Sequence, residues 1–186
     1  MLLTEPFVIR RAELSEAEAL AQFAAHLFRD TYYKDTTAPD IDAHIERNFS
    51  VGHQAAEISD PSAAVFLATF DDRIIGYAHV IFDSVDHRSA FLNRIYVHAG
   101  WRGRGLATEL LETVLSEARQ RGETRLELTV FEQNARAIAF YKRAGFAVTG
   151  NTAFTVGQDV QTDLVMAIDL VEGLDHLTAQ LREQDA

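Results

Sequence analysis

The stretch from Phe91 to Phe146 decides the fold, and it reads FLNRIYVHAGWRGRGLATELLETVLSEARQRGETRLELTVFEQNARAIAFYKRAGF. Its β-branched and aromatic residues predict a strand over Phe91–His98. Apolar residues on one face then predict an amphipathic helix over Gly105–Arg121. A second strand is expected over Arg125–Phe131, and Asn134 is expected to cap a second helix that ends near Gly145. Two strands that flank a helix indicate a right-handed crossover between parallel strands.

The loop between the first strand and its helix carries the chemical signal. Arg102-Gly103-Arg104-Gly105-Leu106-Ala107 joins a strand end to a helix start in a chain that is otherwise acidic. Glycines let a backbone approach a ligand closely, and a helix N-terminus offers unpaired N–H groups to an anion. The loop therefore predicts a diphosphate site, although a glycine-bearing turn with solvated arginines would look the same. It matches neither a P-loop nor the GxGxxG fingerprint.

Two motifs in this stretch resemble the GNAT N-acetyltransferase superfamily. The first is Arg-x-x-Gly-x-Ala, ending at Ala107 and entered through Ile95-Tyr96-Val97. The second follows about 30 residues later as Asn134-x-x-Ala137-x-x-Phe140-Tyr141-x-x-x-Gly145-Phe146. The resemblance extends over nearly the whole chain. It implies an α/β fold with a splayed mixed sheet between helices, acetyl-CoA as donor and an amine as acceptor.

The resemblance also implies which residues hold the donor. The backbone of one strand would pair with the pantetheine arm, and the amides of the following loop would hold the pyrophosphate. The residues expected to bind acetyl-CoA are Ile95, Tyr96, Val97, Arg102, Gly103, Arg104, Gly105, Leu106, Ala107, Thr108, Asn134 and Tyr141.

Two of these residues have structural alternatives. Asn134 is a good helix cap on residue type alone. Tyr141 lies two helical turns further on and shares its face, so it would serve equally as a core aromatic residue. The resemblance assigns Tyr141 as the acid that protonates the departing thiolate. A glutamate that acts as base in some members corresponds here to Thr129, so the base remains unassigned, with Asn93, Glu127 and Glu132 as nearby candidates.

Composition restricts the class of protein. With 186 residues, 47% of them hydrophobic, the chain is expected to form one N-acetyltransferase domain, with a C-terminal helical extension from about residue 172 to residue 186. A net charge of −11 argues against nucleic acid as a partner, and no apolar run or signal peptide is evident. The absence of cysteine excludes a cysteine nucleophile. We expect a cytoplasmic protein without a membrane segment, and a homodimer is compatible with such folds.

The remaining segments predict a sheet with helices inserted after the first strand. That strand is expected over Phe7–Arg10, followed by helices that begin after Ser15 and at Pro39, and by a shorter helix over Gly52–Ile58. Two hairpins are then expected. One joins Ala64–Thr69 to Ile74–Phe82, and the other joins Phe146–Val156 to Val160–Leu170.

The acceptor side is less strongly marked. In the GNAT superfamily the first two helices usually form one wall of the acceptor pocket, and here they offer Phe28, Tyr32 and Tyr33, which would equally suit helix packing. A late segment, Phe154-x-x-Gly157-x-Asp159-x-Gln161-x-Asp163-x-x-Met166, resembles the bacterial spermine/spermidine acetyltransferase branch. Aromatic rings and carboxylates together would suit a polyamine.

Three functions therefore stay open at this point. The first is an N-acetyltransferase that acts on a small cationic amine, with a polyamine, an amino acid or an aminoglycoside-like compound as acceptor. The second is a peptide or protein acetyltransferase that acts on N-termini or lysines. The third is a CoA-binding module without turnover, which the presence of both Asn134 and Tyr141 disfavours. No histidine spacing indicates a metal site.

Overall fold

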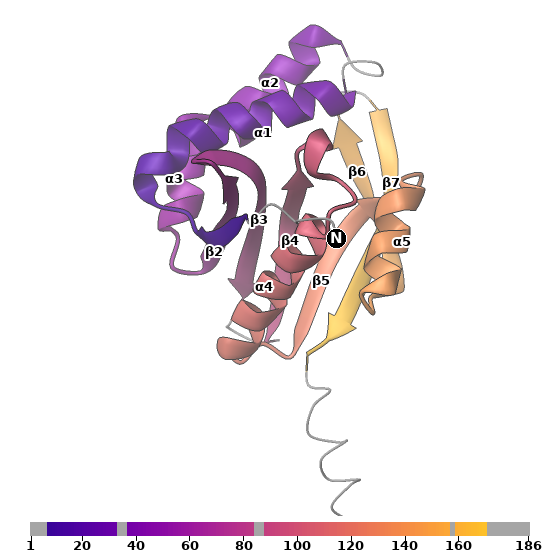
Figure 1. The fold of residues 1–186 in the computed structure, drawn as a ribbon. Coiled ribbons are helices and arrows are strands. Elements are labelled where there is room, and N and C mark those ends of the chain that lie inside the picture. The colour runs from indigo at the N-terminus through magenta and orange to yellow at the C-terminus, as the bar shows by residue number, and fades with distance from the viewer. Residues whose placement is uncertain (1–6, 33–36, 84–87, 157–158, 171–186) are drawn as a thin grey trace, which may run out of the picture.

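The computed structural model describes residues 7–32, 37–83, 88–156 and 159–170 of the chain. Seven strands form one sheet in the order β1-β2-β3-β4-β5-β7-β6 (Figure 1). In chain order they are β1 Val8–Arg11, β2 Ala63–Phe70, β3 Arg73–Asp83, β4 Ser89–Val97, β5 Arg125–Phe131, β6 Ala147–Val156 and β7 Asp159–Asp169. All neighbouring strands are antiparallel except β4 and β5, which are parallel.

Different helices cover the two faces of the sheet. They are α1 Ala17–Tyr32, α2 Ala38–Asn48, α3 Val51–Ser59, α4 Leu106–Gln120 and α5 Ala135–Arg143, with short 3-10 turns at Leu14–Glu16 and Ala99–Trp101. α4 and α5 lie on one face, where Leu110, Leu128 and Met166 belong to the larger core. α1 and α2 pack on the other face around Tyr77 and Leu67. Successive strand residues therefore alternate between two different cores.

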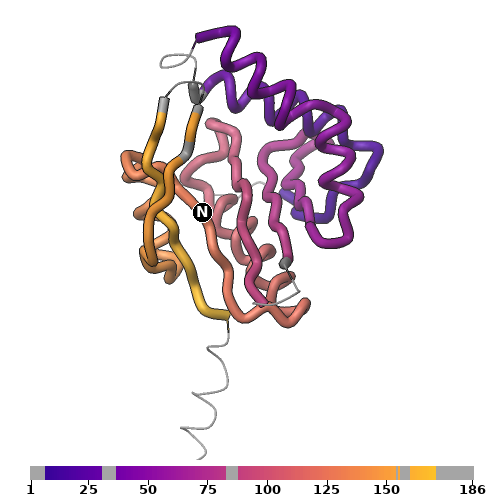
Figure 2. Tube along the Cα trace, turned by 180° about the vertical axis from the view of Figure 1, so that it is seen from behind, coloured from indigo at the N-terminus to yellow at the C-terminus, as the bar shows by residue number. Residues whose placement is uncertain are grey.

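The parallel pair separates soon after it begins. β4 pairs with β5 only where Ser89–Phe91 faces Arg125–Glu127. Beyond that point the two strands diverge, as the view from behind shows (Figure 2). On its other edge, β4 stays paired with β3 as far as Val97, but the register shifts so that Asn93 is an extra residue in β4. Such a bulge bends and twists a strand, and it lies where β4 leaves β5.

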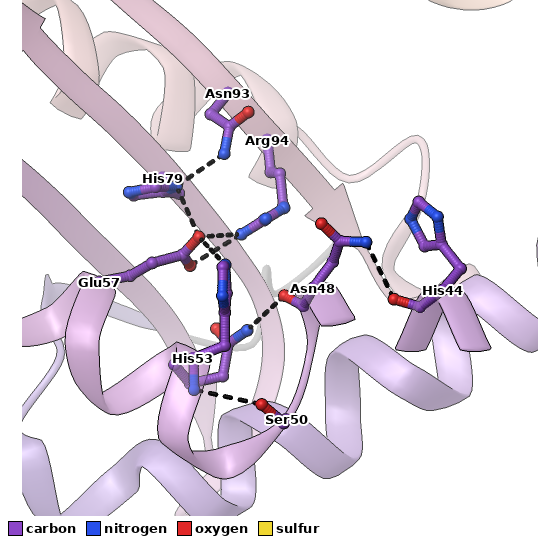
Figure 3. A network of polar contacts seen from close by, with 9 residues as sticks. His44, Asn48, Ser50, His53, Glu57, His79, Asn93 and Arg94 are labelled. Atoms are coloured by element: carbon purple, nitrogen blue, oxygen red, sulfur yellow. Dashed lines mark hydrogen bonds and ion pairs between the residues drawn. The ribbon is translucent and has the colours of Figure 1, made fainter. Parts of the chain in front are cut away.

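A network of polar side chains joins α3 to this bulge (Figure 3). Arg94 Nη1 donates to both carboxylate oxygens of Glu57, at 2.8 and 2.7 Å. His53 Nε2 lies 2.9 Å from Glu57 Oε1, and His79 Nδ1 lies 3.6 Å from the same oxygen. Asn93 Nδ2 lies 3.0 Å from His79 Nδ1. The network therefore ties both bulge residues, Asn93 and Arg94, to α3 and β3.

The charges in this network are largely buried. The Arg94 and Glu57 side chains are 11% and 12% exposed, and the guanidinium lies 5.0 Å from the centre of the Phe49 ring. Burial lowers the pKa of His79, more than the nearby Glu57 carboxylate raises it. His79 is therefore favoured as a neutral imidazole, and Glu57 is the anion that balances Arg94.

The predicted elements were largely confirmed. The crossover from β4 through α4 to parallel β5 and both hairpins are present. Asp71 and Asp72 both have positive φ values, 47° and 58°, as the tight hairpin turn between β2 and β3 requires. Sequence reasoning did not predict that β7 lies between β5 and β6.

One cap was predicted wrongly, and one element lies outside the described part. Ser15 is inside the 3-10 turn before α1, and this turn is capped by Glu13, whose N–H donates to the Glu16 carboxylate at 2.8 Å. The predicted C-terminal helical extension falls outside the described residues. Among the helices that the structure describes, none is both long and apolar enough to cross a membrane.

The network predicts that replacing the Glu57 carboxylate with an uncharged group lowers the stability of the fold strongly. Glu57→Gln would leave the Arg94 guanidinium buried without its counter-ion, so we expect the free energy of unfolding to fall by about 3 kcal/mol. Chemical denaturation would measure the loss. The control is Asp42→Asn, which breaks the exposed pair between Arg29 and Asp42, whose side chains are 53% and 66% exposed. That change should cost less than about 1 kcal/mol. Equal losses in the two variants would contradict the role given to Glu57.

Candidate active site

A cleft of about 570 Å³ opens where β4 and β5 separate, between the N-termini of α4 and α5. It brings together four parts of the chain: the end of β4, the glycine loop, the start of α4 and one face of α5. The residues that line it are Ile95, Tyr96, Val97, Trp101, Arg102, Gly103, Gly105, Ala107, Thr108, Asn134, Arg136, Ala137, Phe140, Tyr141 and Arg143.

The glycine loop supplies the anion-binding end of the cleft. Gly105 precedes α4 in a left-handed conformation, with φ at 83°, and a Cβ atom there would meet nothing within 4 Å. This side of the backbone is therefore open to a ligand. The first N–H groups of α4, at Leu106, Ala107 and Thr108, lack acceptors within the helix and carry its positive dipole end. Together these features suit a phosphate or diphosphate.

The end of β4 contributes backbone rather than side chains. Ile95 and Val97 turn their side chains into the larger core, while Tyr96 turns to the other face, where its ring lies 5.6 Å from the Tyr77 ring. The β4 edge that faces β5 has no pairing to β5 beyond Phe91 in the described residues. Its N–H and C=O groups are thus available to an extended ligand arm.

Asn134 serves as a cap and also lines the cleft. Its side-chain oxygen accepts a hydrogen bond from the Ala137 N–H at 3.1 Å, which begins α5. The helix-capping role expected from the residue type of Asn134 is therefore observed. It does not exclude a ligand contact, because the side-chain amide still has its N–H groups to donate.

Tyr141 lies two turns further along α5 and is 8% exposed. Its ring packs against Phe140 and Phe146, with centroids 5.2 and 5.6 Å away. Burial raises the pKa of the phenol, and the nearby Tyr96 adds to the rise. The hydroxyl makes no hydrogen bond within the part of the chain that the structure describes. Tyr141 is therefore a protonated donor whose hydrogen is available to a ligand in the cleft.

Several residues that were predicted to bind ligands do not line the cleft with their side chains. Leu106 is 1% exposed and packs in the larger core, so only its backbone can face a ligand. The Arg104 guanidinium lies 5.1 Å from the centre of the Trp101 ring. Phe28 is buried in the helical core, stacked on His44 at 4.4 Å. Tyr32 ends α1, but its side chain lies outside the described part, as does Tyr33 altogether.

Sequence reasoning missed five cleft residues, namely Trp101, Arg136, Ala137, Phe140 and Arg143. Of these, Ala137 could have been found from helical spacing, because it lies three positions after Asn134 and four positions before Tyr141 on the same face of α5. Trp101 had no such signal. It joins the cleft through a 3-10 turn, where its ring packs on Phe70 at 5.0 Å.

Across residues 7–32, 37–83, 88–156 and 159–170, no three His, Cys, Asp or Glu side chains gather in a way that could hold a metal ion.

The loop geometry predicts a selective loss of ligand binding. Gly105→Ala should weaken binding of acetyl-CoA, the ligand that the resemblance implies, by about 10-fold or more, because the new methyl group enters the open side of the loop. The positive φ should also cost about 1 kcal/mol of stability. Isothermal titration calorimetry and thermal unfolding would measure the two effects.

Gly122→Ala is the matched control for this change. Gly122 also has a positive φ, 78°, and a Cβ atom added there would meet nothing within 4 Å, but this glycine lies beyond the other end of α4. Its substitution should cost similar stability and leave acetyl-CoA affinity unchanged. If both variants bind acetyl-CoA as tightly as the wild type, the ligand does not approach the loop backbone at Gly105.

Comparison with known proteins agrees with this geometry. The model of the acetyltransferase (GNAT) family matches residues 21–146. An uncharacterized N-acetyltransferase of Mycobacterium tuberculosis is 33% identical over 85% of this chain and 100% of its own length. The L-amino acid N-acetyltransferase of Escherichia coli is 28% identical over 77% of this chain and 84% of its own.

Solved structures give the same fold. The crystal structure of the PaiA N-acetyltransferase from Thermoplasma acidophilum, determined in complex with coenzyme A, superposes with a TM-score of 0.75 at 22% identity. It covers 88% of this chain and 99% of that protein. The open strand pair, the glycine loop and the match over most of the chain lead to one conclusion: this chain belongs to the GNAT family of N-acetyltransferases.

Proposed function

We propose that this N-acetyltransferase transfers acetyl from acetyl-CoA directly to a primary amine of a small cationic acceptor, and that polyamines are its preferred class. The observation that carries the proposal is the opening between β4 and β5. A thioester lying in the cleft would reach this opening from the side of α4 and α5. An amine could then approach it from the opposite face of the sheet, without a covalent enzyme intermediate.

Different residues of the cleft would bind different parts of acetyl-CoA. The N–H groups at the start of α4 and the Arg102 side chain suit the phosphates, because they combine a helix dipole with a cation. The free edge of β4 suits the amide groups of the pantetheine arm. A backbone N–H of this edge near Val97 would also stabilise negative charge on the thioester oxygen.

Transfer itself requires three proton movements. An alkylamine has a pKa of about 10.4, so the acceptor must lose a proton to solvent or a base before its nitrogen attacks the thioester carbon. As the C–N bond forms and the C–S bond breaks, the nitrogen loses a second proton and the thiolate receives one. Tyr141 suits this last step, because a phenol is protonated at neutral pH and the hydroxyl has no competing partner in the described residues.

Charge supports a cationic acceptor. The chain carries a net charge of −11, yet Arg102, Arg136 and Arg143 all line the cleft. The cations are therefore concentrated where phosphates are expected, and the rest of the molecule is more acidic than its total charge suggests. An acidic surface attracts amines and raises their local concentration. The E. coli relative is named for a small amine substrate, which favours a small acceptor over a protein.

The assignment of Tyr141 predicts a catalytic defect without a binding defect. Tyr141→Phe keeps the ring in its packing with Phe140 and Phe146 but removes the proton donor. Turnover should fall by about 100-fold or more, within the usual range for a lost acid. Acetyl-CoA affinity should stay unchanged, because the loop and β4 supply it. Thiol release and calorimetry would measure the two quantities.

Tyr77→Phe is the control for removal of a buried hydroxyl. Tyr77 is fully buried, and its hydroxyl has no hydrogen-bond partner among the described residues, but it does not line the cleft. Its substitution should leave turnover within about twofold of the wild type, since no proton transfer passes through it. Near wild-type thiol release from Tyr141→Phe, with binding intact, would make Tyr141 a packing residue and leave the acid unassigned.

The acceptor class gives a further prediction. Spermidine should be acetylated with a higher kcat/KM than a peptide with a free N-terminus or an internal lysine, because several positive charges interact with the acidic surroundings. The advantage of spermidine should shrink as salt is raised from low to physiological strength, since salt screens exposed charges. Efficient turnover of peptides together with no turnover of spermidine would overturn the polyamine proposal and favour a peptide acetyltransferase.

A further inference from the structure

Asp163 is a buried carboxylate without a partner. It is 9% exposed. It makes no hydrogen bond or ion pair with any residue that the structure describes, and no charged neighbour contributes to its pKa. Burial alone raises the pKa of its carboxyl, with no neighbouring cation to offset the effect. The fully buried side-chain atoms without a partner in the described residues do not include the Asp163 oxygens, so the carboxylate is mostly buried but still reached by solvent. Its raised pKa means that its negative charge opposes folding.

The register of the sheet places Asp163 on the face away from the acetyl-CoA cleft. Asp163 of β7 is the partner of Phe131 in β5, so their side chains lie on the same side. The adjacent pair, Val130 and Leu164, turns into the core beneath α4 and α5. Because strand residues alternate, Phe131 and Asp163 face the opposite side of the sheet. This is the face from which an acceptor would approach.

Asp163 also lies along the open part of the sheet. Its partner Phe131 is at the end of β5, beyond the last residue that pairs with β4, Glu127. The segment of β5 beside Asp163 therefore borders the opening between β4 and β5. In Figure 2, which shows this face, the β6–β7 hairpin stands on one side of the diverging strands and α1 and α2 stand on the other.

The cations on this face are already engaged. Arg125 contacts Glu127 at 3.0 Å and Asp169 at 3.5 Å, at the closed end of the sheet. Arg94, across the opening on β4, is held by both oxygens of Glu57. β6, the other neighbour of β7, carries no charged residue between Ala147 and Val156. Among the described residues, none supplies a cation to Asp163.

We propose that the Asp163 carboxylate binds an ammonium group of the acceptor at the opening between β4 and β5. The proposal rests on the function proposed above and specifies how the same site selects a cation. An incoming ammonium would supply the charge and the hydrogen-bond donors that Asp163 lacks in the chain. A charge-assisted hydrogen bond in a partly buried site would then contribute to both affinity and orientation.

The test compares Asp163→Asn with Asp169→Asn. Asp169 lies on the same strand and the same face, but its side chain is 70% exposed at the closed end of the sheet. Both variants remove one negative charge. Asp163→Asn should raise the KM for spermidine by about 10- to 100-fold, the range expected for a lost hydrogen bond to a charged group. Asp169→Asn should change this KM by less than about twofold. Neither variant should alter the affinity for acetyl-CoA.

Thermal stability provides a second test, in which the direction of the change in Tm is the result that matters. A carboxyl whose pKa is raised by folding favours the folded state below its unfolded pKa, and this advantage is lost as pH rises through the folded pKa. At pH 8 the Asp163 charge therefore destabilises the protein. Asp163→Asn should leave Tm unchanged or raise it at pH 8. Added spermidine should raise the Tm of the wild type and of Asp169→Asn, but not that of Asp163→Asn.

Three outcomes separate this proposal from the function on which it rests. If the wild type acetylates spermidine and Asp163→Asn does so with an unchanged KM, Asp163 does not bind the acceptor and the proposed function stands. If Asp163→Asn lowers Tm at pH 8, the carboxylate has a structural partner and the inference is overturned. If the wild type acetylates no amine although it binds acetyl-CoA, the proposed function itself fails.

Discussion

The separation of β4 from β5 is the constraint on which the rest of the site depends. Parallel strands that stay paired leave no free backbone edge between them. Here the pairing stops at Phe91 and Glu127, so the strand edges beyond are available to a ligand. The positions of α4 and α5 follow from this opening, since each helix starts beside one of the diverging strands. The glycine loop and Asn134 thereby reach the same cleft.

An opening in a sheet is costly, because it removes backbone hydrogen bonds from the interior. Its position must therefore be stabilised from elsewhere. The bulge at Asn93 bends β4, and the Glu57 network holds both bulge residues against α3. The network contains no cleft residue, yet it sets where the free edge of β4 begins. This accounts for a charged cluster that lies outside the cleft and between elements distant in the sequence.

The sequence allowed prediction of features that depend on local periodicity. Alternation and helical spacing located most elements, and the spacing of Asn134 and Tyr141 placed both on the face of α5 that lines the cleft. Features that depend on long-range register were not predictable. Glu57 and Arg94 are 37 positions apart, and no local pattern pairs them. The burial of Asp163 depends on β7 lying beside β5, which a simple hairpin of β6 and β7 does not specify. Phe28 had the residue type of an acceptor-binding group, but its stacking on His44 depends on how α1 and α2 pack.

The two faces of the sheet impose opposite electrostatic requirements on a single reaction. The donor brings phosphates, and the cleft on the side of α4 and α5 gathers Arg102, Arg136 and Arg143. A cationic acceptor would be repelled by those arginines if it entered from the same side. Approach from the opposite face avoids this repulsion, because the cations there are neutralised by Glu57, Glu127 and Asp169. For the proposed cationic acceptor, the sheet would therefore separate the charges of the two substrates, and its opening would be the place where the thioester and the amine meet.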